Sequence, residues 1–98
     1  MAEEYNGYYN WEVWNVMSWL DNEHDIYERK IKVFSDYYEN KINTSKFNQG
    51  INQVGRQAHM RSDIKKKKLT KTEINQLRKE IKEQYQEYKK YRKEQGSY

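Results

Sequence analysis

The chain of 98 residues contains no cysteine and no proline, and only four glycines. Without cysteine it can form no disulfide and no thiolate metal site, which suits a reducing compartment. Without proline, long uninterrupted helices are allowed. No apolar run approaches the roughly 20 residues of a membrane span, and the N-terminus has no apolar signal segment. We therefore expect a cytoplasmic protein that makes no membrane contact.

Aliphatic residues are also scarce, with seven Ile, four Val and three Leu. Ten Tyr, three Trp and two Phe make up the shortfall. Tyrosine and tryptophan bring large apolar area with a polar atom attached, so the core should be small and rich in aromatic rings. The length fits one domain, residues 1–98.

The charge is distributed unevenly along the chain. Residues 1–60 carry six Lys or Arg and nine Asp or Glu, a net charge of −3. Residues 61–98 carry thirteen Lys or Arg and six Asp or Glu, a net charge of +7. A chain polarised in this way suggests a partner with its own charge pattern, or nucleic acid that meets the C-terminal half.

Apolar spacing predicts a helical body, rich in aromatic residues, over residues 1–61. The expected order is an irregular arm over 1–9, followed by helices over 11–20, from 22–25 to about 42, and 46–61. Asn10 and Ser45 are the expected N-caps of the first and third helices. Gly50 and Gly55 lie inside the third helix, where each weakens it or allows another backbone to approach.

A basic linker over residues 62–69 should lead into a long helix over 70–95. Thr70 and Glu73 have the spacing of a capping box, with Leu69 and Ile74 placed for a hydrophobic staple. The apolar face of this helix is expected to contain Ile74, Leu77, Ile81, Tyr88 and Tyr91. We expect its first half to pack on the body and its tyrosine end to project. The predicted fold is thus all-α, a three-helix domain with an aromatic core and a long C-terminal amphipathic helix.

Aromatic side chains are the first candidate for a partner-binding site. Trp19 lies well off the apolar stripe of its helix, so it is expected to be more exposed than Trp14. All three tryptophans could instead pack a small core. Trp and Tyr are frequent hot spots of interfaces. We therefore expect the partner-binding side chains to be Trp19, Tyr8, Tyr9, Tyr85, Tyr88 and Tyr91.

The tryptophan segment also carries a resemblance. Its residues are Asn10, Trp11, Glu12, Trp14, Asn15, Val16, Trp19, Asp21, Asn22, Glu23 and Tyr27. Over about residues 6–28, this segment resembles the N-terminal motif of small domains of unknown function from phages, plasmids and archaeal viruses, which read Asn-Trp-Glu-x-Trp-Asn-Val. The resemblance implies a mobile-element origin and no particular activity.

A basic region is the second candidate site. Seven Lys or Arg lie between Arg56 and Lys71, against the single acid Asp63. Such a patch can neutralise phosphates, or it can be a solvated surface that keeps the protein soluble. The cations expected to bind nucleic acid or an acidic surface are Arg56, Arg61, Lys65, Lys66, Lys67, Lys68, Lys71, Lys89, Lys90, Arg92 and Lys93.

The sequence gives little support for catalysis. It has no glycine-rich phosphate loop and no His paired with a nucleophile. Glu23, His24, Asp25 and Glu28 could bind a divalent cation, but acids at a helix N-terminus are the commoner explanation. We expect no enzyme, no cofactor and no metal.

We therefore expect a non-enzymatic phage or mobile-element protein that binds and blocks a host protein or ribonucleoprotein. The most concrete version is an inhibitor of a CRISPR nuclease, an anti-CRISPR-like protein. A basic C-terminal half does not suit mimicry of DNA, so such an inhibitor would contact guide RNA, an acidic protein groove, or both. Two alternatives stay open: an accessory protein that binds nucleic acid directly, and a structural protein that assembles with a second copy of itself.

Overall fold

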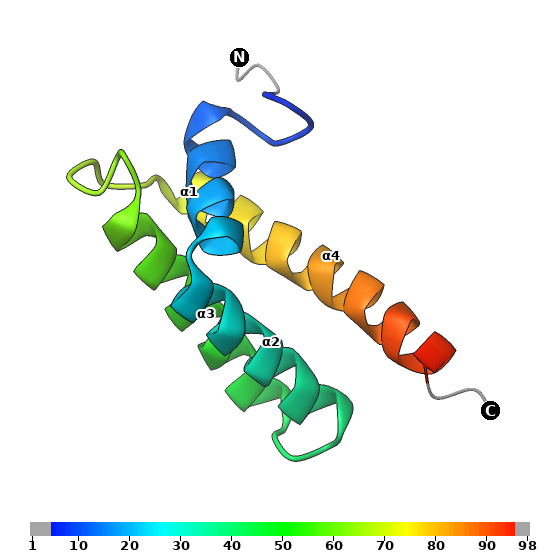
Figure 1. Cartoon of the computed structure of the whole chain (residues 1–98). Helices are drawn as coiled ribbons and strands as arrows, with labels where there is room; N and C mark the ends of the chain where they lie inside the picture. The colour runs from blue at the N-terminus through cyan, green and yellow to red at the C-terminus, as the bar shows by residue number, and fades with distance from the viewer. Residues whose placement is uncertain (1–4, 96–98) are drawn as a thin grey trace.

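The computed structural model describes residues 5–95, which form four α-helices and no named strand. The helices are α1 (Trp11–Asn22), α2 (His24–Tyr38), α3 (Thr44–Arg61) and α4 (Lys71–Gln95). Figure 1 shows α2 and α3 as an antiparallel pair, with α1 leading into α2 and α4 crossing the molecule. The all-α prediction is confirmed.

Helix α1 begins as its sequence predicts. The Asn10 side chain accepts a hydrogen bond from the backbone N–H of Val13 (2.9 Å), which satisfies one of the free donors at a helix start. The expected apolar stripe is buried, at 1% exposure or less. Its members are Val13, Val16, Met17 and Leu20.

Helix α2 ends at Tyr38, earlier than predicted. Asn40 has a positive φ of 62°, its N–H donates to Tyr37 O (3.1 Å), and the N–H of Lys41 donates to Asp36 O (2.8 Å). These two bonds form a Schellman motif, which closes a helix at a left-handed residue, commonly Gly or Asn. Ile42 therefore lies beyond the helix, although its spacing suggested another turn.

Helix α3 carries the predicted buried stripe of Phe47, Ile51, Val54 and Ala58. Its N-cap is Asn43, whose side chain accepts from the Lys46 N–H (2.9 Å), so the prediction of Ser45 was wrong by two residues. An asparagine accepts this bond as readily as a serine, so local sequence does not distinguish the two positions.

Helix α4 begins with the predicted capping box. The N–H of Thr70 donates to Glu73 Oε1 (2.9 Å), and the N–H of Glu73 donates to Thr70 Oγ1 (3.1 Å). The buried face contains Leu77, Ile81 and Tyr85. Tyr85 is only 6% exposed, so the prediction that it belongs to a projecting tip was wrong.

Aromatic rings from three helices form the part of the core where α2, α3 and α4 meet. The Phe34 ring centroid lies 5.3 Å from that of Tyr85 and 6.4 Å from that of Phe47. Tyr37 stacks on Phe47 at 4.1 Å. Since aliphatic residues are few, these large rings supply much of the apolar area that folding buries.

Candidate binding surface

The polar residues of the tryptophan segment bind other parts of the chain. Besides capping α1, Asn10 donates through its amide nitrogen to Glu73 Oε2 (2.8 Å). Glu73 also accepts from Thr70, so a continuous set of hydrogen bonds joins the N-termini of α1 and α4. The side chain of Asn10 therefore has a structural role.

The segment between α3 and α4 is fixed to α1. Asn15, 3% exposed, donates to Asp63 Oδ2 (3.0 Å) and accepts from the Asp63 backbone N–H (3.1 Å). Lys67 forms an ion pair with Glu12, and their hydrogen bond lowers the pKa of Glu12 and raises the pKa of Lys67. We call residues 62–69 the basic loop, because they form a loop held against α1.

A buried lysine lies where α1, α2 and α4 meet. Lys30 is 5% exposed, and its Nζ donates to Asp21 Oδ1 and to Gln84 Oε1, both at 2.9 Å. Gln84 also donates to Asp21 Oδ2 (3.1 Å). A buried charge is tolerated when it is paired in this way. This network explains why a glutamine interrupts the apolar spacing of α4.

Three aromatic rings lie together at the start of α1. The Trp14 ring centroid lies 4.9 Å from that of Tyr5 and 6.4 Å from that of Trp11. Tyr5 and Trp11 keep 39% and 38% of their surface exposed, whereas Trp14 is half-buried between them. We call Tyr5, Trp11 and Trp14 the aromatic platform. It offers partly exposed rings on a rigid base, as interface hot spots do.

The aromatic residues chosen from sequence at this end are less exposed than Tyr5 and Trp11. Trp19 is half-buried, as is Trp14. Tyr8 and Tyr9 are half-buried and pack against the core. Burial raises the pKa of Tyr8. The exposed rings of this end are therefore Tyr5 and Trp11. Trp11 could have been recognised from its place at the edge of the apolar stripe.

The basic loop lies at the same end of the molecule as the platform (Figure 1). The Lys67–Glu12 ion pair joins the loop to the residue that follows Trp11, and Figure 1 shows the loop and the N-terminal arm at the same end of the molecule. Lys65, Lys66 and Lys68 are exposed, and within residues 5–95 no hydrogen bond or ion pair occupies their ammonium groups. We call these three the loop lysines. They can attract phosphates or carboxylates without breaking an existing pair.

The other cations of the predicted basic region differ in their surroundings. Arg61 donates to both Asp25 oxygens at 2.6 and 2.7 Å, and this bidentate contact raises the pKa of Arg61. Arg61 is thus already paired. Arg56 and Lys71 are exposed on α3 and α4.

The C-terminal end of α4 is more occupied than predicted. Arg92 donates to Tyr88 Oη (2.6 Å) and Glu39 Oε2 (3.0 Å), and its guanidinium lies 4.8 Å from the Tyr38 ring centroid. Tyr88 is half-buried, and the Lys89 Nζ lies 5.7 Å from the Tyr85 ring centroid. Of the predicted site residues here, Tyr91, Lys90 and Lys93 are exposed.

The acidic cluster at the start of α2 is used for ion pairs. Glu23 and Asp25 both contact Arg61, and His24 lies against Glu28. The Arg61 hydrogen bond lowers the pKa of Asp25. In the described part of the chain, no group of three or more His, Asp or Glu side chains is arranged to hold a metal ion.

Comparison with known proteins adds no relative. No family model, curated protein or solved structure matches the chain. Among residues 5–95, no helix has the length and apolar character that crossing a membrane requires.

Proposed function

We propose that this is a non-enzymatic phage or mobile-element protein that binds a host nucleoprotein and blocks it, most concretely a CRISPR nuclease. The observation that carries the proposal is that the exposed rings of the aromatic platform and the basic loop lie at the same end of the molecule (Figure 1), where the Lys67–Glu12 ion pair joins the loop to α1. A nucleoprotein presents both kinds of surface that this end of the molecule suits. Its protein offers pockets for Tyr and Trp anchors, and its guide RNA offers phosphates for lysines.

The local geometry supports a preformed surface. Trp11 and Trp14 of the platform stand on α1, whose start is capped by Asn10, and the basic loop is attached to α1 through Asn15 and Glu12. Binding would therefore order few additional groups, which favours affinity.

The proposal is tested by affinity capture from a lysate of CRISPR-carrying bacteria, with and without nuclease treatment. The expected result is a CRISPR effector that survives the treatment, and whose cleavage of target DNA falls when the protein is added. Trp11→Ala should weaken both capture and inhibition, whereas Tyr91→Ala, an exposed ring on α4, is the matched control. An effector that is captured and still cleaves at full rate would contradict the proposal.

A second candidate is an accessory protein that binds single-stranded nucleic acid directly. The specific observation that favours it is that stacked rings beside lysines also suit unpaired bases and their phosphates. Loss of every partner after nuclease treatment, together with quenching of tryptophan fluorescence by a mixed-sequence oligonucleotide, would favour this candidate over the inhibitor.

Assembly through the last helix has less support. Leu77 and Ile81, which belong to the predicted apolar face of α4, are 5% and 1% exposed. They pack on the body of the same chain, so they are not free for a second copy.

A further inference from the structure

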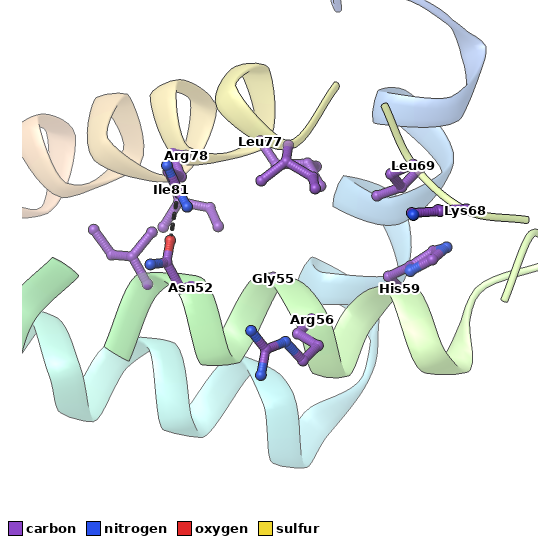
Figure 2. A pocket seen from close by; sticks show the side chains of 11 residues that line it. Asn52, Gly55, Arg56, His59, Lys68, Leu69, Leu77, Arg78 and Ile81 are labelled. Atoms are coloured by element: carbon purple, nitrogen blue, oxygen red, sulfur yellow. Dashed lines mark hydrogen bonds between the residues drawn. The ribbon is translucent and has the colours of Figure 1, made fainter. Parts of the chain in front are cut away.

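A groove of about 330 Å³ lies between α3 and α4. Figure 2 shows it between the two helices, with Leu69 and Lys68 of the basic loop at one end. Its apolar wall includes Ile51, Leu77 and Ile81, and Ile74 at its edge is 40% exposed. Ile51, Leu77 and Ile81 are at most 5% exposed and form the floor of the groove, whereas the exposed part of Ile74 at its edge is available to a partner's side chain.

Gly55 keeps the groove open. A Cβ at Gly55 would meet only Ile81 Cδ1, at the ordinary contact distance of 3.7 Å. At Gly50, by contrast, a Cβ would come within 2.9 Å of Val33 Cγ2. Packing therefore requires glycine at position 50 and does not require it at position 55. Glycine inside a helix lowers stability, so its presence at 55 has no explanation in the fold alone.

The rim of the groove is cationic. Arg56, Lys68 and Arg78 line it, and no acidic side chain does so among the described residues. Arg78 donates through Nε to Asn52 Oδ1 (2.6 Å), a neutral acceptor that orients the guanidinium without cancelling its charge. Arg56 and Lys68 have no ion pair within the part of the chain that the structure describes. A carboxylate at this rim would meet several uncompensated cations, and arginine binds carboxylates in bidentate fashion.

We infer that this groove binds an acidic peptide segment of a protein partner. One Leu or Phe of the segment lies in the part of the groove beside Gly55, which we call the slot. The Asp or Glu residues on either side of it contact the arginines of the rim. The groove lining contains no Phe, Tyr or Trp, and its one aromatic ring, His59, is hydrogen-bonded through Nε2 to Ile64 O (3.0 Å), which favours a peptide over stacked bases. The inference goes beyond the proposed function and is tested separately from it, because its main residues belong to α3 and α4 and not to the platform.

The test uses the full chain and short fluorescein-labelled peptides of Asp and Glu with one central Leu or Phe. Fluorescence anisotropy should show the anchored acidic peptides binding about ten- to hundredfold more tightly than the same peptides with Ala at the centre. Peptides with Lys in place of the acids should not bind. Equal binding of acidic and basic peptides, or no binding of any, would overturn the inference.

Two sets of variants separate the slot from the rim. Gly55→Leu fills the slot and should abolish peptide binding, whereas Gln53→Leu, at an exposed position of the same helix, should leave it unchanged. Arg56→Glu with Arg78→Glu should reverse the preference from acidic to basic peptides, a gain of binding that an unfolded protein cannot show. Retention of acidic-peptide binding in folded Gly55→Leu would overturn the inference. The inference would also be overturned if Gly55→Leu removed oligonucleotide binding or self-association of the protein, and if acidic peptides did not compete with either.

Discussion

The molecule has two regions in which aromatic and basic residues are interleaved, and they differ in how those residues are used. At the α1 end, which contains the aromatic platform and the basic loop, Trp11 is 38% exposed and the loop lysines lack ion pairs within residues 5–95. At the tyrosine end, formed by the last turns of α2 and α4, Tyr85 is 6% exposed and Arg92 is paired with Glu39. Similar local composition thus leaves exposed rings and unpaired lysines at one end, and is used for packing and ion pairs at the other.

The position of the acids accounts for much of this difference. Glu39 accepts from Arg92 and Ser35 and pairs with Lys41, and these contacts lower its pKa to about 2. At the α1 end, Glu12 pairs with Lys67 and leaves the loop lysines uncompensated. Charge that is already paired offers little to a partner, whereas uncompensated charge steers association.

The largest expected effect is on stability at the tyrosine end. Tyr85→Ala removes a ring that contacts Phe34 and Phe47, and should lower the free energy of unfolding by roughly 3–5 kcal/mol. Trp11→Ala, at the other end, should lower it by about 1 kcal/mol, the scale of one aromatic pair. Urea denaturation measures both, with Tyr85→Phe as the control that keeps the ring. Equal losses from the two alanine variants would remove the distinction between the ends.

The second prediction concerns salt dependence. If the proposed target is bound through phosphates, changing Lys65, Lys66 and Lys68 together to Gln should reduce the log–log salt slope by up to about 3 on duplex DNA. Lys67 is left out because it is paired with Glu12. A control with Lys46, Lys79 and Lys82 changed to Gln, which are exposed on α3 and α4, should keep the slope. If both triple variants have the same slope, the loop lysines are only solubilising surface.

The third prediction compares the two glycines of α3, which runs between the ends. Gly50→Ala forces a methyl group against Val33 and should destabilise the protein by about 1–3 kcal/mol. Gly55→Ala has room and should stabilise it by up to about 1 kcal/mol, because alanine restricts the unfolded chain. Thermal unfolding of the two variants should therefore shift in opposite directions. A loss of stability from Gly55→Ala would show that the groove is more tightly closed than described.

The smallest expected effect is the pH dependence at Glu39. Because its folded pKa of about 2 lies below the ordinary 4.5, its contribution to stability is present above pH 4.5 and is lost as the pH falls through about 2. Glu39 is exposed, so solvent keeps this contribution small. The melting temperature of wild type should exceed that of Glu39→Gln above pH 4.5, and the difference should disappear near pH 2. A difference that stays constant over this range would contradict the assignment.

Local signals predicted the starts of the helices best. The Asn10 cap and the Thr70–Glu73 capping box depend on residues three positions apart, so the sequence contains all the information they need. The end of α2 was missed because the apolar spacing continues to Ile42, while the decisive feature is the left-handed Asn40. Asparagine at such a position is a recognisable stop signal.

Contacts between segments that are distant in the chain could not be predicted from the sequence. Gln84 breaks the apolar spacing of α4, and only the fold shows that it meets Lys30 and Asp21. Tyr85 was expected at the projecting tyrosine end of α4, and the fold instead packs this ring against Phe34. The same limit applies to the groove, since no spacing within α3 and α4 reveals that Gly55 and Arg78 line one opening.

The central claim, that the α1 end is the binding surface, is tested most directly by matched variants in one inhibition assay. The first variant combines Trp11→Ala with Lys65→Gln and Lys66→Gln, and the second combines Tyr91→Ala with Lys82→Gln and Lys90→Gln. Cleavage of target DNA by the captured nuclease is measured against the concentration of each folded variant. If the α1 end is the binding surface, the first variant no longer inhibits and the second inhibits like wild type. Inhibition that survives in the first variant and is lost in the second would contradict it.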